Sequence, residues 1–395
     1  MDAFDKATGR TKYYEDLMPR DALYVRIRHS TIAHGFVKSV DKSAAEAIPG
    51  VVKVLTCFDV PEHPFPTAGH PWSMDPGHQD VADRHLLNRH VRYYGDDVAW
   101  SLRKRGGRHA GVRALQVEYE ELPLVLDAQE AMKPGAPQLH EAFPNNILKH
   151  TDMKKGDYQA AIQEPGLIKV EGWYDTPRCS TATLRITGAS PMRKTAASPW
   201  WPPPRSPHHP PGGGPGLGRP WSDIRVVKPY IGGGFGNKQD ALYEPCAPGA
   251  PPRSRAAVSA STAPGRKPSS PTGCATPSGS TSCPGSDRTA PLPPERWSCS
   301  PTRGLRLPRT QHRGQGHGSF PQHYPCDNME CDAWTVFTNR PAAGAMRGYG
   351  MPQASFADEA NVEDCAKAWA WTLWPSGCRT SCPRVRGRLL PQREL

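Results

Sequence analysis

The sequence lacks the cysteine pairs and the long apolar runs that mark many metal-binding and membrane proteins. None of its eleven cysteines belongs to a C-x-x-C pair, so the usual ligand pattern of a zinc or iron–sulfur site is missing. No apolar run reaches the roughly 18 residues of a membrane-spanning helix, and the charged residues 1–6 do not resemble a secretory signal. We therefore expect a cytoplasmic protein with reduced thiols and no membrane partner.

Acidic side chains are scarce in three basic tracts, which account for the formal net charge of +11: residues 179–218, 246–318 and 369–395. The second tract holds ten lysine and arginine residues against Asp287 and Glu295. A basic nucleic-acid-binding protein needs aromatic side chains interleaved with its charges on a folded surface. Because the tracts contain no such aromatic ladder, we expect no nucleic-acid partner.

The most specific motif is a β-branched strand that runs into a glycine-rich loop at residues 226–240. Phe235 stands among its glycines, which are Gly232, Gly233, Gly234 and Gly236. Backbone without side chains can approach a ligand closely, and successive amides form an anion-binding concavity. Lys238 does not fit the G-x-x-x-x-G-K-[ST] pattern of a nucleotide phosphate loop. For the glycines alone, a plain tight turn is the alternative.

A second loop of small residues, 339–353, carries one guanidinium. Its centre is Arg347, and Tyr349 follows two positions later. The planar guanidinium can bond oxo and phosphate oxygens. A solvated arginine is the alternative for this residue taken alone.

The two loops together resemble the cofactor loops of the xanthine dehydrogenase and aldehyde oxidase family, in particular the separate molybdenum-binding subunit of bacterial xanthine dehydrogenases. Further strings are similar to the same family, at residues 5–14, 30–35, 47–56 and 87–99. The resemblance implies a mixed α/β (α+β) fold. An α/β hammerhead domain is expected at 1–125 and a partial molybdenum-cofactor-binding domain at 140–368, followed by an aberrant tail at 369–395.

The resemblance also implies an oxidoreductase that hydroxylates a purine such as xanthine or hypoxanthine, or an aldehyde-type substrate. A molybdenum-bound hydroxide attacks the substrate, and electrons pass to an iron–sulfur subunit and an FAD subunit. The implied cofactor is molybdenum–molybdopterin in its cytosine dinucleotide form, with no direct side-chain ligand to the metal. The positions that match cofactor contacts are Gly233, Gly234, Phe235, Gly236 and Arg347. Gln239 and Tyr349 match positions that contact the substrate.

Two functional residues of the family have no counterpart in this sequence. A cofactor-contacting glutamine should lie in the strand before Gly218, where the proline-rich string 200–204 stands instead. The general-base glutamate is expected beyond Leu395. Glu330 and Glu359 are interpreted as surface or helix residues, not as substitutes. We therefore expect this chain alone to have no hydroxylase activity.

Two Pro/Arg-rich tracts, 179–216 and 246–318, interrupt the expected cofactor-binding domain, and we expect them to lack regular packing. A native proline-rich linker is one explanation. A disrupted coding frame is the other, because a one-base shift in a chosen codon string for 304–318 gives a family-like strand and loop.

A non-catalytic α/β interaction protein, or a decayed paralogue, is the main alternative function. It predicts a stable fragment 1–178 and no molybdenum uptake. A basic nucleic-acid-binding protein is less favoured. The irregular spacing of His34, His78 and His90 favours ordinary structural or surface histidines over a metal site.

Overall fold

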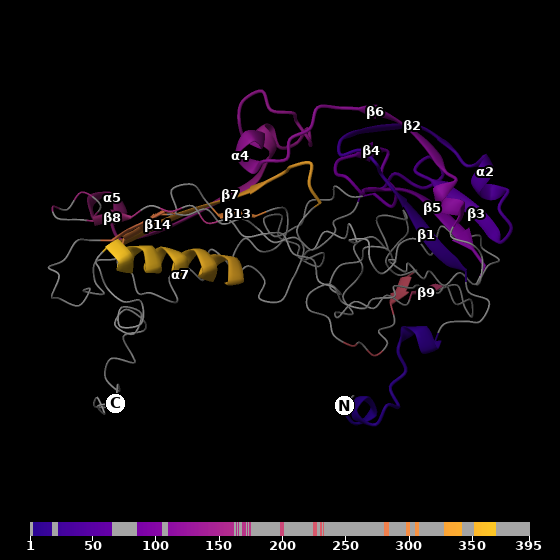
Figure 1. Ribbon diagram of the computed structural model, residues 1–395, viewed down its shortest axis with the longest axis horizontal. Coiled ribbons are helices and arrows are strands. Elements are labelled where there is room, and N and C mark those ends of the chain that lie inside the picture. Colours follow the sequence, from indigo (N-terminus) through magenta and orange to yellow (C-terminus); the bar gives the residue numbers. More distant parts are fainter. Residues whose placement is uncertain are drawn as a thin grey trace. The chain divides into compact units, whose positions relative to one another are not determined.

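The computed structural model of the chain describes six main stretches and some short pieces between residues 163 and 307 (Figure 1). The main stretches are residues 3–17, 23–64, 85–104, 110–161, 328–341 and 351–368. The chain divides into two compact units. The first unit comprises Met1–Asp127, Ser180–Thr272 and Thr338–Ala345, and the second comprises Ala128–Cys179, Gly273–Phe337 and Met346–Leu395.

The first unit contains two antiparallel three-stranded sheets. One sheet has the order β1-β5-β3, with β1 at Tyr24–His29, β5 at Asp97–Arg103 and β3 at Val51–Thr56. The other has the order β4-β2-β6, with β4 at His90–Val91, β2 at Gly35–Asp41 and β6 at Gln116–Glu121. A parallel pair joins β9 (Ser198–Trp200) to β10 (Ile224–Val226).

Short helices complete the first unit. They are α1 (Ala3–Ala7), the 3-10 helix η1 (Tyr14–Leu17), α2 (Ser43–Glu46) and α3 (Ala110–Arg113). The helix that the sequence predicts near residues 43–47 is therefore confirmed as α2.

Strand β5 forms the centre of the first unit, because every one of its residues is buried. Alternate side chains of a strand point to opposite faces. Accordingly, Val98, Trp100 and Leu102 belong to one apolar cluster, whereas Ala99 belongs to a second cluster with Leu115 and residues of α2 and β3. Since β1 and β3 also pair with its two edges, β5 is enclosed on all sides.

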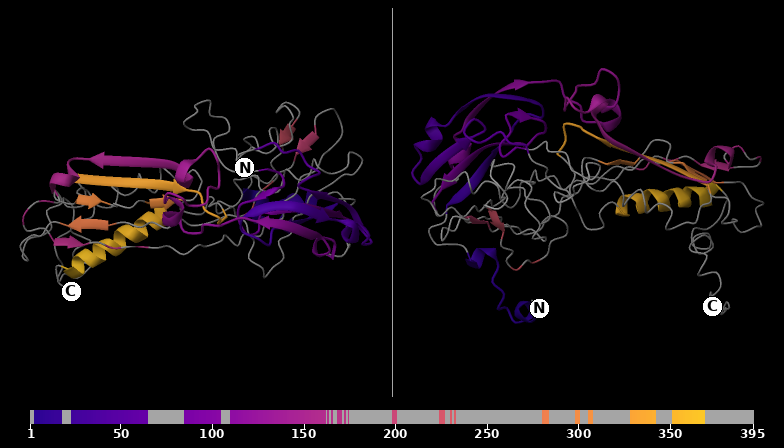
Figure 2. Two further views of the ribbon diagram at one scale, coloured as in Figure 1. Left: turned by 90° about the horizontal axis from the view of Figure 1, so that it is seen from above. Right: turned by 180° about the vertical axis from the view of Figure 1, so that it is seen from behind.

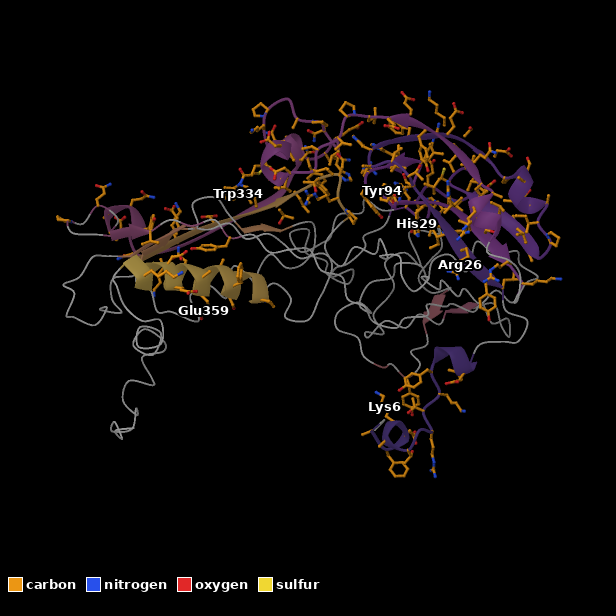
Figure 3. The ribbon with its side chains drawn as sticks, viewed as in Figure 1. Lys6, Arg26, His29, Tyr94, Trp334 and Glu359 are labelled. Carbon is orange, nitrogen blue, oxygen red and sulfur yellow. The ribbon has the colours of Figure 1, made fainter. Side chains whose placement is uncertain are left out.

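The second unit is a mixed sheet organised by the long strand β14 (Asn328–Val336). On one edge, β14 pairs antiparallel with β7 (Ile147–Lys155); on the other, it pairs parallel with β12 (Ser298–Ser300) and β13 (Leu305–Leu307). The sheet continues through β11 (Ser280–Cys283) to β8 (Ile168–Val170). Trp334 of β14 stacks on His150 of β7, with ring centroids 4.7 Å apart (Figure 3).

Helix α7 (Met351–Ala368) lies along one face of this sheet, near β8 and β11 (Figure 2). The unit also contains α4 (Ala128–Ala131), the 3-10 helix η3 (Pro144–Asn146) and α5 (Tyr158–Ala161). None of the helices that the structure describes has the length and apolar character of a membrane span.

The expectation that tracts 179–216 and 246–318 lack regular packing is wrong at four short strands. Strand β9 lies in the first tract, and β11, β12 and β13 lie in the second. Strand pairing uses backbone N–H and C=O groups, which nearly every residue type supplies, so short stretches can join a sheet edge without a hydrophobic pattern. All other residues of these tracts lie outside the described part of the chain.

Replacing Tyr174 by phenylalanine is expected to destabilise the second unit by about 1–2 kcal/mol. The phenol donates to Asp364 Oδ2 of α7 at 2.8 Å and accepts from Nδ2 of the buried Asn361 at 3.3 Å. Burial and the bond to Asp364 raise the pKa of Tyr174 to about 12, so this donor stays protonated at neutral pH. Urea unfolding of Y174F measures the loss. Tyr94 is 64% exposed (Figure 3) and gives the control Y94F, which should change stability by less than about 0.5 kcal/mol.

Candidate functional site

The seven residues that the sequence assigns to cofactor or substrate contacts all lie outside the described residues. They occupy 233–239 in the glycine loop and 347–349 in the arginine loop. The structure instead describes how each loop begins. The first residues of both loops belong to the first unit, so their surroundings can be compared directly.

The glycine loop begins beside the N-terminal segment. Tyr230 donates from its hydroxyl to Asp5 Oδ2 at 3.3 Å. A Cβ atom added at Gly232 would lie 3.9 Å from Cε1 of Tyr13, an ordinary van der Waals distance. The opening string 5–14 and the glycine loop, two separate motifs of the sequence, therefore meet in the fold.

The arginine loop begins at Asn339, three residues after β14 ends. The Asn339 side chain is buried and makes three hydrogen bonds. Its Oδ1 accepts from the Val125 amide at 2.8 Å, and its Nδ2 donates to the carbonyls of Arg92 at 2.8 Å and Ala33 at 3.4 Å. The Asn339 amide also donates to the Val125 carbonyl at 2.8 Å. The sequence alone indicates no role for Asn339, because its partners are distant in the chain.

Two of the three histidines considered as a metal site do meet. Nε2 of His90 lies 3.3 Å from Nε2 of His34, and Nδ1 of His34 donates to the Pro123 carbonyl. This bond leaves neutral His34 with an acceptor at Nε2, so His90 donates from its own Nε2. Phe36 stacks on His90 at 4.4 Å, and His78 lies outside the described residues. Within the described ranges, no group of three or more His, Cys, Asp or Glu residues could hold a metal ion.

A further histidine of the first unit, His29, pairs with an aspartate, and its pKa is raised. His29 Nδ1 lies 3.0 Å from Oδ1 of the buried Asp97, at the end of β1 (Figure 3). Burial opposes a charge on His29, but the hydrogen bond and charge of Asp97 outweigh burial and raise the pKa of His29. The neighbouring Asp96 is buried and accepts from Asn88 Nδ2 at 2.6 Å.

Of the two glutamates that the sequence assigns to the surface or to a helix, Glu359 fits this prediction and Glu330, half-buried on a strand, does not. Glu330 on β14 pairs with Lys154 at 2.8 Å and accepts from Gln159, and these partners lower its pKa. A lowered pKa makes a carboxylate a weaker base. Glu359 is exposed on α7 (Figure 3). Cys57 and Cys365 are buried thiols, and burial raises the pKa of Cys57 to about 11.

Comparisons with known families agree along most of the chain. Residues 8–123 match the family model of the aldehyde oxidase and xanthine dehydrogenase a/b hammerhead domain. Residues 139–259 and 310–372 match that of the molybdopterin cofactor-binding domain.

Individual relatives show the same likeness. The xanthine dehydrogenase molybdenum-binding subunit of Escherichia coli O157:H7 is 33% identical over 93% of this chain and 49% of that protein. The nicotinate dehydrogenase large molybdopterin subunit of Eubacterium barkeri is 28% identical over 93% of this chain and 84% of that protein. The aldehyde oxidoreductase of Desulfovibrio desulfuricans ATCC 27774 has the same fold, with a TM-score of 0.79 at 22% identity, over 97% of this chain and 43% of that chain.

The chain thus spans about half the length of the Escherichia coli relative, and both of the domains that the sequence predicts are matched in order. The mixed α/β fold class is confirmed. The chain belongs to the xanthine dehydrogenase and aldehyde oxidase family of molybdenum-binding subunits, with an α/β hammerhead domain followed by part of the molybdopterin cofactor-binding domain.

Proposed function

We propose that this chain forms part of the molybdenum-binding subunit of a purine hydroxylase that oxidises xanthine or hypoxanthine. The observation that carries the proposal is the presence of both cofactor loops, in family order, in a chain 33% identical to a xanthine dehydrogenase molybdenum-binding subunit. The proposed cofactor is molybdopterin in its cytosine dinucleotide form. The proposed partners are an iron–sulfur subunit and an FAD subunit, which take the electrons.

The donor types of the two loops suit an anionic, oxygen-rich group. Glycine amides around Phe235 offer hydrogen bonds without obstructing side chains, and Arg347 offers a planar guanidinium. Both loops start in the first unit, where Tyr230 donates to Asp5 and Asn339 bonds Val125. The loops would therefore bind and orient molybdopterin, while the bound cofactor would supply the oxidative chemistry. We place the substrate against Gln239, which can hydrogen-bond a purine but cannot ionise, and Tyr349.

Removing the guanidinium of the arginine loop is expected to reduce molybdenum binding at least about tenfold, because a charge-assisted bidentate contact is lost. The full chain is produced together with the machinery that makes the cytosine dinucleotide cofactor, and molybdenum and cytosine nucleotide are measured per chain. Arg347→Ala is compared with Arg340→Ala, which removes an exposed arginine near the start of the same loop. Equal molybdenum content in the two variants would contradict the role of Arg347. An unmodified chain without molybdenum would favour the non-catalytic α/β protein or decayed paralogue.

The same preparation tests activity. We propose that no glutamate of this chain acts as the general base. Purine-dependent dye reduction should therefore stay at background even in a cofactor-loaded chain. Measurable reduction would overturn that expectation.

A disrupted coding frame remains our proposal for the Pro/Arg-rich tracts. The matched parts of the cofactor-binding domain leave out residues 260–309, which lie inside the second tract. The first tract lies within a matched part, so this support extends to the second tract alone. The short strands β11 and β12 count against the proposal. Resequencing the coding DNA around residues 246 and 318 decides it, since a frame without compensating insertions or deletions excludes a shift.

A further inference from the structure

The Asn339 side chain makes three of its four possible hydrogen bonds inside the first unit. A carboxamide has two N–H donors and a carbonyl acceptor. Here the two donors reach the carbonyls of Arg92 and Ala33, and the acceptor takes the Val125 amide. The residue is 2% exposed, so water does not replace these partners. Its role is therefore defined by three specific contacts.

The partners of Asn339 come from three separate segments. Ala33 precedes β2, Arg92 follows β4, and Val125 lies in the segment after β6. The backbone adds a fourth bond, from the Asn339 amide to the Val125 carbonyl. Asn339 and Val125 thus bond each other in both directions, with the side-chain oxygen standing where a backbone carbonyl would stand in a strand pair. Such an arrangement fixes the position of Asn339 relative to the sheet β4-β2-β6.

We propose that Asn339 is a positioning residue that fixes the start of the arginine loop on the first unit. This inference rests on the proposed function, in which Arg347 contacts the cofactor eight residues further along the chain. Asn339 itself acts through the loop and does not touch the cofactor.

Asparagine suits this position for a chemical reason. Aspartate keeps the acceptor for Val125 but loses both donors and sets a carboxylate against two carbonyl oxygens. Alanine leaves one amide and two carbonyls without their partners, and unsatisfied buried polar groups are costly. Either change should release the start of the loop.

The test compares Asn339→Ala with Asn146→Ala in the full chain. Asn146 is the comparison, because it is also a buried asparagine whose side chain makes three bonds, to Leu139, Ala131 and Pro137 in the second unit. Its φ of +56° adds backbone strain to the alanine variant, so N146A tests a loss of stability at least as large. Hydrogen exchange is measured at the Val125 amide without cofactor, and molybdenum content is measured after cofactor loading. N339A should speed exchange at Val125 about tenfold or more and lower molybdenum per folded chain several-fold. N146A should change hydrogen exchange near Leu139, and it should leave exchange at Val125 and the molybdenum content unchanged.

The outcomes separate the two proposals. Unchanged exchange at Val125 in N339A overturns the anchoring role, whatever the cofactor does. Faster exchange with full molybdenum content overturns the link between the anchor and the site. An unmodified chain that takes up no molybdenum overturns the proposed function, and with it the role of Asn339 toward the cofactor. If N339A does not fold, Asn339→Ser gives the same readings with less side-chain volume removed.

Discussion

Alanine at position 35 is expected to destabilise the first unit by about 3–5 kcal/mol, one of the largest effects of a single methyl group in this chain. Gly35 opens β2 and pairs with both β4 and β6. A Cβ atom there would lie 2.1 Å from the Glu120 carbonyl oxygen and 2.7 Å from Cδ1 of Ile32. Backbone cannot yield as a flexible side chain does, so β2 would have to leave its partner β6.

The control is Gly135→Ala. Gly135 has a φ of +83°, but a Cβ atom there would meet nothing within 4 Å. Only the backbone strain remains, and it should cost about 1 kcal/mol. Urea unfolding, followed by hydrogen exchange of the β2 and β6 amides, measures both variants. Equal losses in the two variants would show that contact with Glu120 does not decide the effect.

Acid is expected to weaken the first unit through His90, by about 1–2 kcal/mol between neutral pH and pH 4, because His90 is only half-buried and solvent screens part of the effect. Burial, the Arg92 charge and His34 lower the pKa of His90 from 6.5 to about 4. Between pH 6.5 and about pH 4, His90 is therefore protonated in the unfolded chain but not in the folded chain. The free energy of unfolding falls with pH over this range. Glu120 is in register with His90 on the other side of Phe36. It is exposed and lies two strands away, and it is not among the groups that shift the pKa of His90.

His90→Gln should remove most of this acid sensitivity, measured as the free energy of unfolding at pH 7, 5.5 and 4. His29→Gln is the matched comparison, because the pKa of His29 is raised. His29 stabilises the fold below its unfolded pKa, and this contribution is lost as the pH rises through its higher folded pKa. Its pair with Asp97 is partly exposed and is worth at most about 1 kcal/mol. H29Q should therefore make the acid loss slightly steeper. Parallel curves for H90Q and the unmodified chain would contradict the assignment to His90.

The features that could be predicted from the sequence are those carried by continuous motifs, and the features that depend on contacts between distant residues could not be predicted. The order of the two domains and helix α2 follow from motifs that are continuous in the sequence. The meeting of His34 and His90 does not, because it depends on the pairing of β2 with β4 across 56 residues. Asn339 was hidden for the same reason, since its side-chain partners are 214 to 306 residues away.

The short strands in the Pro/Arg-rich tracts could not be predicted from pattern either. Their pairing partners include β8, β10 and β14, which are distant in the chain, so no local motif indicates the pairing. The residues of the proposed cofactor site remain predictions, because the structure describes only how their loops begin.

The enclosed position of β5 sets an order of events during synthesis. β1 and β3 leave the ribosome first, but each pairs with β5 and neither pairs with the other. Until residues 97–103 emerge, both strands expose unpaired edges and apolar side chains, the state in which strands associate wrongly with other chains. A nascent chain that stalls before β5 is thus prone to aggregation, and rapid translation through this region protects the first unit.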